Sequence, residues 1–291
     1  MRISLYLLFY SGLLLFQQPL FSQTISVSEL VDSLKKVQTA EDSVDILNKL
    51  AWELESNIDR GLPYALRALE ISEQRGYEKG LGDSYSRLGM MAEIIGNYEL
   101  AVFLYQSSLE IRKLISITGN STAGAHNNLG NAYAYRTDYL NAIHHFRQAI
   151  QIRSSLVEQG EVDPYYLAMV FINLSSALAI EGQIQAAIDT LREVDLLELG
   201  ESEGYLAPKL ARSYGLVFLE GDQFDSASHY YRKALKLAKD NGAAKAEIAE
   251  ILNQMGLVAQ QKGLYQEAID TCFTQALAIL GEQDSSSLKR I

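Results

Sequence analysis

The residues best suited to metal binding or nucleophilic chemistry are few and far apart in this chain. There are four histidines, His126, His144, His145 and His229, and one cysteine, Cys272. His144 and His145 are adjacent, so on a helix they point in different directions and cannot hold one ion from one face. The spacing therefore favours neither a metal site nor a nucleophilic cysteine.

Other catalytic motifs are missing from the sequence as well. It contains no glycine-rich phosphate loop, no Gly-x-Ser-x-Gly and no His-Glu-x-x-His. The carboxylate pairs Glu53 with Glu55 and Glu201 with Glu203 are typical of a solvated surface rather than of acid–base catalysis. We predict no catalytic residue, no cofactor and no metal, and an enzyme is the least favoured of the alternatives.

Composition and charge narrow the choice of partner. The 291 residues are 48% hydrophobic and 21% charged, as in ordinary globular proteins. A formal net charge of -11 disfavours nucleic acid, which needs a basic stripe, and also disfavours anionic membrane surfaces. We expect a protein or peptide partner.

The first residues have the pattern of a secretory signal peptide. Arg2 supplies the positive start, residues 5–16 form an apolar run too short for a convincing membrane span, and Leu20-Phe21-Ser22 precedes a possible cleavage point. We predict a signal peptide at residues 1–22 and a periplasmic or secreted protein. An uncleaved anchor is the alternative, because Leu20 is bulky where a small residue is preferred.

A pattern with a period of about 40 residues organises the rest of the chain. A small residue between apolar and aromatic residues recurs at Gly89, Gly130, Ser175, Gly215 and Gly256. In each unit the surrounding apolar positions have helical spacing on both sides of a short turn. Such a period predicts stacked helix–turn–helix units, none of which buries its apolar face alone.

These residues resemble the tetratricopeptide repeat family. The third unit shows the pattern best, with Leu129, Gly130, Tyr133, Tyr139, Ala142, Phe146 and Ala149. The resemblance implies an all-α, right-handed superhelical solenoid of about six repeats over residues 42–280. It also implies that Cys272 occupies the position of a core aromatic residue on a second helix. A lead helix in residues 23–41, with Thr39 and Asp42 at the start of the next helix, and a polar tail at 281–291 complete the expected domains.

The same resemblance implies a concave groove lined by the first helix of each repeat. Carried over by register, the predicted partner-binding residues are Trp52, Asn127, Asn131, Tyr135, Lys209, Arg212, Asn253 and Gln260. Further groove positions are Asn48, Glu55, Ser86, Met90, Glu93, Ile172, Ser176, Ile180, Leu216 and Leu257. In this interpretation Lys209 and Arg212 bind a carboxylate and Asn131 bonds a peptide backbone. The alternative for each residue is plain solvated surface.

A narrower resemblance concerns the order of the segments. A signal peptide, a lead helix, the segments 47–52 and 65–71, and long repeats look like the extracytoplasmic repeat region of Bacteroidetes-type sensor kinases and regulators. This resemblance implies an exported, non-catalytic protein-binding scaffold or a sensor-type input module for signal transduction. A structural or assembly factor of the cell envelope is the alternative.

Overall fold

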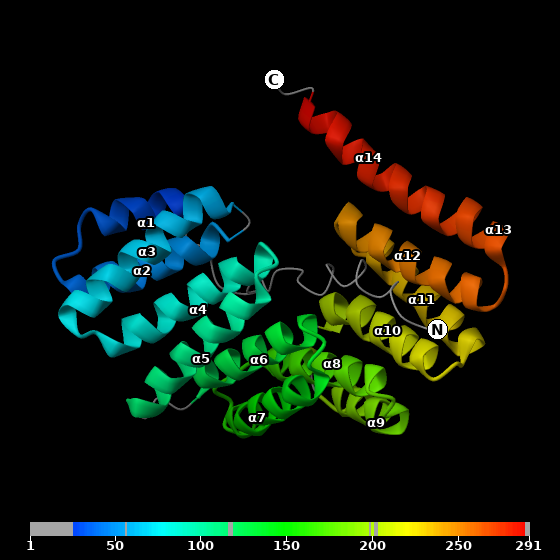
Figure 1. Cartoon of the computed structure of the whole chain (residues 1–291), viewed down its shortest axis with the longest axis horizontal. Helices are drawn as coiled ribbons and strands as arrows, with labels where there is room; N and C mark the ends of the chain where they lie inside the picture. The colour runs from blue at the N-terminus through cyan, green and yellow to red at the C-terminus, as the bar shows by residue number, and fades with distance from the viewer. Residues whose placement is uncertain (1–25, 56, 116–118, 198, 201–202, 289–291) are drawn as a thin grey trace. The chain divides into compact units, whose positions relative to one another are not determined.

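The computed structural model describes residues 26–55, 57–115, 119–197, 199–200 and 203–288. All regular structure in these ranges is helical, as predicted (Figure 1). No helix in the described ranges is long and apolar enough to cross a membrane. The predicted signal peptide at residues 1–22 lies outside the described residues.

The described chain divides into two compact units, residues 21–170 and residues 171–291, and the division falls within α8. The helices of the first unit are α1 (Val27–Leu34), α2 (Ala40–Glu53), α3 (Ile58–Arg75), α4 (Glu78–Ile94), α5 (Tyr98–Leu114), α6 (Asn120–Tyr135) and α7 (Tyr139–Glu158). Helix α8 (Pro164–Ile180) contributes residues to both units. The helices of the second unit are α9 (Ile184–Asp195), α10 (Glu203–Glu220), α11 (Phe224–Asp240), α12 (Lys245–Gln261), α13 (Tyr265–Glu267), the π-helix η4 (Ala268–Phe273) and α14 (Thr274–Leu288).

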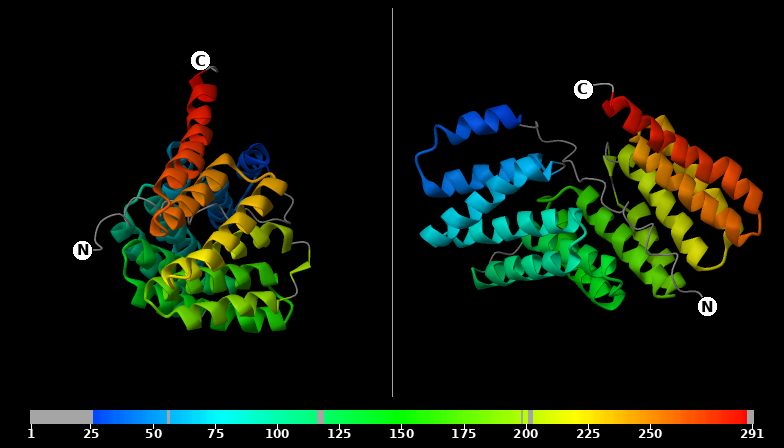
Figure 2. Two further views of the ribbon diagram at one scale, coloured as in Figure 1. Left: turned by 90° about the vertical axis from the view of Figure 1, so that its right-hand side faces the viewer. Right: turned by 45° about the horizontal axis from the view of Figure 1, so that its top comes forward.

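Contacts between neighbouring helices have the order expected of repeats. Each helix from α2 to α6 packs on the next, and α2 also contacts α4, as α4 contacts α6. In the second unit α10 packs on α11, α11 on α12, and α12 on α14. Figure 2 shows α14 running beside α12. This order confirms the all-α repeat fold.

The lead helix occupies only part of the segment predicted for it, residues 23–41. Ser26 and Glu29 form a capping box at the start of α1, but the helix ends at Leu34 and only Leu30 is buried. Thr39 caps α2 by accepting a hydrogen bond from the backbone N–H of Asp42, the start that the sequence indicated.

The turns within the repeats follow one design. Gly96 adopts a left-handed conformation (φ 77°), after which Asn97 caps α5 by accepting a hydrogen bond from the N–H of Leu100. Thr137 (φ 60°) and the cap Asp138 do the same between α6 and α7. In these two turns a left-handed residue followed by a polar cap ends the first helix and starts the second, whereas Gln183 and Gln223, which precede α9 and α11, form no side-chain cap bond.

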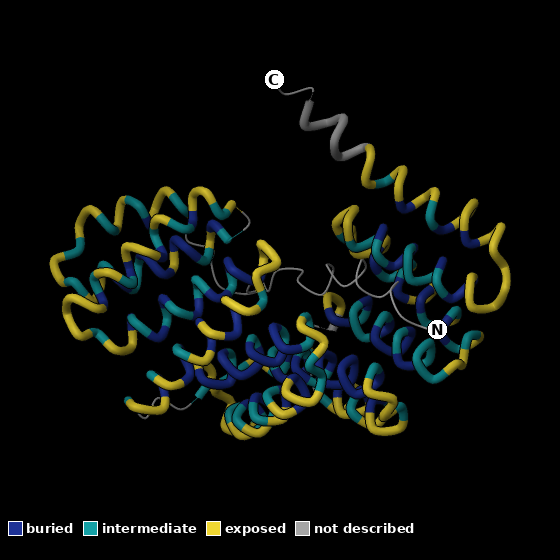
Figure 3. The backbone as a smooth tube through the Cα atoms, in the orientation of Figure 1, coloured by how far each residue is buried: buried dark blue, intermediate teal, exposed yellow. Residues whose placement is uncertain are grey.

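A glycine under an aromatic ring joins the two helices of four repeats. A Cβ at Gly130 would lie 2.5 Å from the ring of Phe146, and one at Gly89 would lie 2.7 Å from the ring of Tyr105. Gly215 and Tyr231 repeat this arrangement. Because the glycine lets the ring approach the first helix closely, Tyr105, Phe146 and Tyr231 are almost completely buried. Figure 3 colours the backbone of buried residues dark blue.

The last repeat departs from the expected register. Tyr105 follows Gly89 by 16 residues, but the ring over Gly256 belongs to Phe273, which follows it by 17. The π-helix η4 inserts this extra residue. Cys272 is buried as predicted, but the prediction that it takes the core-aromatic position is wrong. At the end of the chain, α14 continues through Gly281, so part of the predicted polar tail is helical.

Candidate functional site

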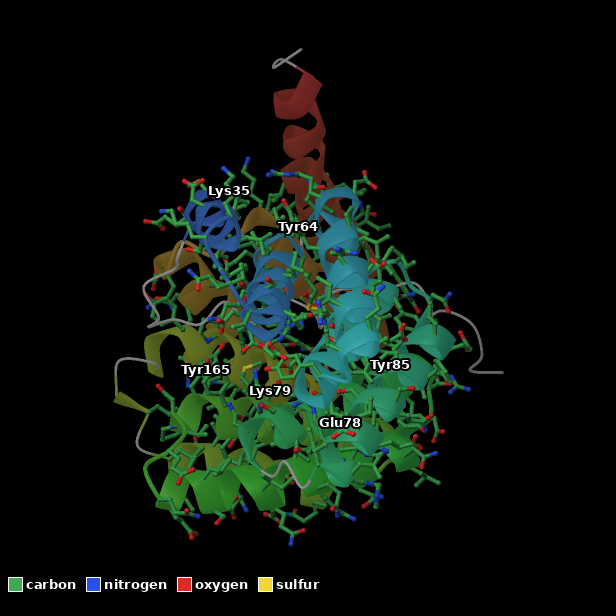
Figure 4. The ribbon with its side chains drawn as sticks, turned by 90° about the vertical axis from the view of Figure 1, so that its left-hand side faces the viewer. Lys35, Tyr64, Glu78, Lys79, Tyr85 and Tyr165 are labelled. Carbon is green, nitrogen blue, oxygen red and sulfur yellow. The ribbon has the colours of Figure 1, made fainter. Side chains whose placement is uncertain are left out.

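The predicted residues of α2 lie beside polar groups of α4. Asn48 is buried and accepts a hydrogen bond from Ser84. Nearby, Lys79 at the start of α4 binds Asp45 at 3.0 Å (Figure 4). The first helices of neighbouring repeats are thus joined by polar contacts, and Asn48 is part of that structure.

Trp52 of α2 lies under a cation that the sequence analysis did not select. The Arg87 guanidinium carbon is 4.3 Å from the Trp52 ring centroid, a close cation–π contact. Burial lowers the pKa of Arg87, while Asp83 and Glu55 oppose that shift. The sequence analysis did not select Arg87 because it lies between the predicted groove positions 86 and 90. Only the tertiary structure shows that it lies against Trp52.

Glu55, just after α2, is a half-buried carboxylate in the same region. Burial raises its pKa to about 7, Arg87 acts against this rise and Glu53 adds to it. The sequence analysis interpreted both Glu53 and Glu55 as solvated surface residues. Glu53 is exposed, in agreement with this interpretation, but Glu55 is half-buried.

Glu93, in the last turn of α4, is buried more deeply. It is 4% exposed, and its Oε2 accepts a hydrogen bond of 2.8 Å from the hydroxyl of Tyr105. Its Oε1 is buried and has no hydrogen-bond partner among the described residues. Burial raises the pKa of Glu93 to about 7, and the bond from Tyr105 limits the rise.

Two stacked tyrosines lie next to Glu93. The rings of Tyr98 and Tyr135 are 4.9 Å apart at 11°, joining the start of α5 to the end of α6. Tyr98 begins α5 five residues after Glu93, across the turn that follows α4. Burial raises the pKa of Tyr98, and the charge of Glu93 adds to the rise. We call the whole set the aromatic–carboxylate cluster; it consists of Trp52, Glu55, Arg87, Glu93, Tyr98, Tyr105 and Tyr135.

Other predicted positions of the first unit have structural bonds or partial exposure. Ser86 is buried and bonded to Ser108 of α5 at 2.8 Å. Asn127 is buried, whereas Asn131 and Met90 are half-buried. The three predicted positions Asn127, Asn131 and Tyr135 all lie on α6, at intervals of four residues.

In the second unit the predicted basic pair is already engaged. Arg212 Nη1 lies 2.7 Å from Glu250 Oε2 of α12, with both side chains mostly buried. Burial and the charge of Arg212 lower the pKa of Lys209. The sequence analysis expected Arg212 to bind a carboxylate of a ligand. In the structure Arg212 binds a carboxylate of the chain itself, that of Glu250.

The remaining predicted positions of the second unit vary in burial. Ile172 and Ser176 are buried, and Ser176 bonds to the carbonyl of Ile172. The half-buried positions are Ile180, Leu216, Asn253 and Leu257, and Gln260 is exposed.

Two histidines that the sequence separated meet in the fold. His126 of α6 and His145 of α7 have their Nδ1 atoms 3.0 Å apart, and Tyr133 stacks on His145. Burial is the main cause that lowers the pKa of both to about 4, so at neutral pH they are a neutral pair in which one ring donates to the other. Within the described ranges no third histidine, cysteine or carboxylate completes a metal-binding group.

Comparison with known proteins agrees with this architecture. Residues 123–155 and 213–241 each match a tetratricopeptide repeat family. A protein described as KINESIN LIGHT CHAIN-RELATED 2, from Arabidopsis thaliana, is 27% identical over 263 residues, an alignment that covers 84% of this chain and 33% of the relative. The chain thus spans about a third of that relative's length.

Solved structures share the fold at low identity. The apo form of RapI has a TM-score of 0.69 at 17% identity and covers 88% of this chain and 92% of its own. NprR in complex with its cognate peptide NprX has a TM-score of 0.62 at 17% identity and covers 83% of this chain and 68% of its own. The comparisons therefore show an all-helical solenoid fold in which two segments match tetratricopeptide repeats.

Proposed function

We propose that this chain is a peptide-binding repeat scaffold that presents the aromatic–carboxylate cluster to a partner polypeptide. The observation that carries the proposal is the partly buried combination of Trp52, Arg87 and Glu93 on neighbouring first helices. Aromatic rings next to a few oriented charges are the usual composition of peptide anchor sites. The likeness to NprR, whose structure contains a cognate peptide, supports the same mode of action.

The proposed role is binding without chemistry. The cluster pairs a carboxylate with a tyrosine and a guanidinium with an indole, which are groups that orient and hold a ligand. A polypeptide bound along several repeats would contact the same face in each of them. The consequence for the cell is then a change in the assembly or signalling of the bound partner.

We further propose that the chain is exported and acts as a sensor-type input module. The charged and apolar pattern of residues 1–22 and the order of the segments that follow support this part of the proposal. The alternative is an assembly factor of the cell envelope. Fractionation of the source cells, with mass spectrometry of the mature N-terminus, tests export: a new N-terminus after Ser22 supports it, and an intact chain in the cytoplasm contradicts it.

Selection from a displayed library of random peptides tests binding itself. We expect the wild-type chain to enrich a consensus and Trp52→Ala to weaken the enriched peptides about tenfold or more, since the indole supplies an anchor surface. Phe103→Ala is the matched control, because Phe103 is an aromatic residue of the second helix α5 and is 61% exposed. Circular dichroism confirms that both variants fold. Failure to enrich any consensus would contradict the proposed function.

A further inference from the structure

One carboxylate of the aromatic–carboxylate cluster lacks a counter-charge. Glu93 is 4% exposed, forms a single hydrogen bond, to neutral Tyr105, and takes part in no ion pair among the described residues. A buried carboxylate is normally paired, because removing an isolated charge from water is costly. The free Oε1 of Glu93 is therefore a group for which the fold itself provides no partner.

The neighbouring charges do not supply this partner. Arg87 lies over Trp52, and no ion pair joins it to Glu93 among the described residues. Arg112 binds Asp83 at 2.6 Å. Lys79 also binds Asp83, at 3.8 Å, so the neighbouring cations Arg112 and Lys79 are both directed at Asp83 and not at Glu93.

The surroundings of Glu93 suit a cationic group. The Tyr98–Tyr135 stack begins five residues beyond it, across the turn between α4 and α5, and offers aromatic surface, which attracts ammonium and guanidinium groups. Arg136, next to Tyr135, is already paired with Glu99 at 3.4 Å, so this edge adds no free positive charge. The residues after Glu93, from Ile94 to Asn97, are exposed. The end of α4 therefore reaches the surface one residue beyond Glu93.

We infer that Glu93, with the stacked rings of Tyr98 and Tyr135, is the subsite that binds a lysine or arginine side chain of the partner peptide. This inference rests on the proposed peptide-binding function and specifies its ligand. The cation replaces the missing counter-charge, and the carboxylate–cation pair forms where water is largely excluded, which strengthens it. Selectivity arises because a neutral or acidic side chain would leave Glu93 unpaired.

A peptide library with defined ends tests the subsite. We would use N-acetylated, C-amidated peptides built on the consensus from the selection above, with each position fixed in turn as Lys, Arg, norleucine or Glu, and measure binding by fluorescence anisotropy. At one position we expect Lys or Arg to bind about tenfold or more tightly than norleucine. Glu93→Gln removes that preference, so that Lys, Arg and norleucine at this position bind about equally.

Glu110→Gln is the matched control, since it removes the same charge from an exposed position on α5. It should keep the preference for Lys or Arg. Calorimetry at pH 7 in buffers of different ionisation enthalpy gives a second readout: the Lys peptide releases a fraction of a proton from wild type and none from Glu93→Gln, because a bound cation favours the ionised carboxylate.

The outcomes separate the two proposals. If no library peptide binds, the proposed function fails. If peptides bind but show no preference for Lys or Arg, or if Glu93→Gln keeps that preference, peptide binding stands and the cation subsite is overturned.

Discussion

Two helix pairs of this chain are built alike yet differ at one buried position. In α4 and α5, Gly89 lies under Tyr105, whose hydroxyl binds Glu93. In α10 and α11, Gly215 lies under Tyr231, and the residue that corresponds to Glu93 is Leu219. The hydroxyl of Tyr231 has no hydrogen-bond partner among the described residues.

The difference separates packing from recognition. The glycine and the ring are needed in both pairs because they set the distance between the helices. Glu93 is not needed for packing, since Leu219 serves in the other pair, and burial of a carboxylate opposes folding when it is charged. A residue that costs stability and is absent from the equivalent position is a better candidate for function than the repeated core.

The largest expected effect concerns the part that both pairs share. Gly89→Ala and Gly215→Ala should each lower the free energy of unfolding by about 3 kcal/mol, because the new methyl group would overlap a buried tyrosine ring. Gly124→Ala in α6 is the control, since nothing lies near its Cβ, and it should stabilise the chain by up to about 1 kcal/mol. Urea unfolding measures all three. Equal effects at Gly89 and Gly124 would contradict the close packing.

The next effect concerns Glu93 and depends on pH. Its folded pKa of about 7 lies above the ordinary value of 4.5, so between these values the native state binds more protons than the unfolded state. The free energy of unfolding of the wild type therefore falls as pH rises through this window. Glu93→Gln lacks this loss and should be more stable by about 2 kcal/mol at pH 8, with little difference at pH 4.

Chemical unfolding across this pH range provides the measurement. Glu55, whose pKa is also raised to about 7, contributes equally to both chains and cancels in the difference. A stability difference that is independent of pH would show that Glu93 is not the buried, titrating group described here.

The smallest effect distinguishes the two tyrosine hydroxyls. Tyr105→Phe should cost about 1–2 kcal/mol at pH 8, because it removes the one hydrogen bond of a buried carboxylate. Tyr231→Phe should change the free energy of unfolding by less than about 0.5 kcal/mol, or raise it, since that hydroxyl is buried without a partner. Thermal unfolding of the two variants gives the comparison, and equal losses would refute the distinction.

Much of the fold was predictable from the sequence because it depends on local patterns. The recurring small residue, the helical spacing around it and the cap at Thr39 specify helix pairs and their order along the chain. The extra residue of η4 was not predictable from the sequence. The regular repeat spacing selects Cys272 as the residue over Gly256, and the π-helix puts Phe273 there instead.

The site was decided by tertiary structure. Register alone selected Trp52, Glu93 and Tyr135 but could not show that Arg87 covers Trp52 or that Arg212 is already bound to Glu250. Sequence patterns report which side of a helix a residue occupies. Whether a charge on that side is paired depends on the neighbouring helix, and so does the pKa of a carboxylate such as Glu93, because both follow from distance and from exclusion of water.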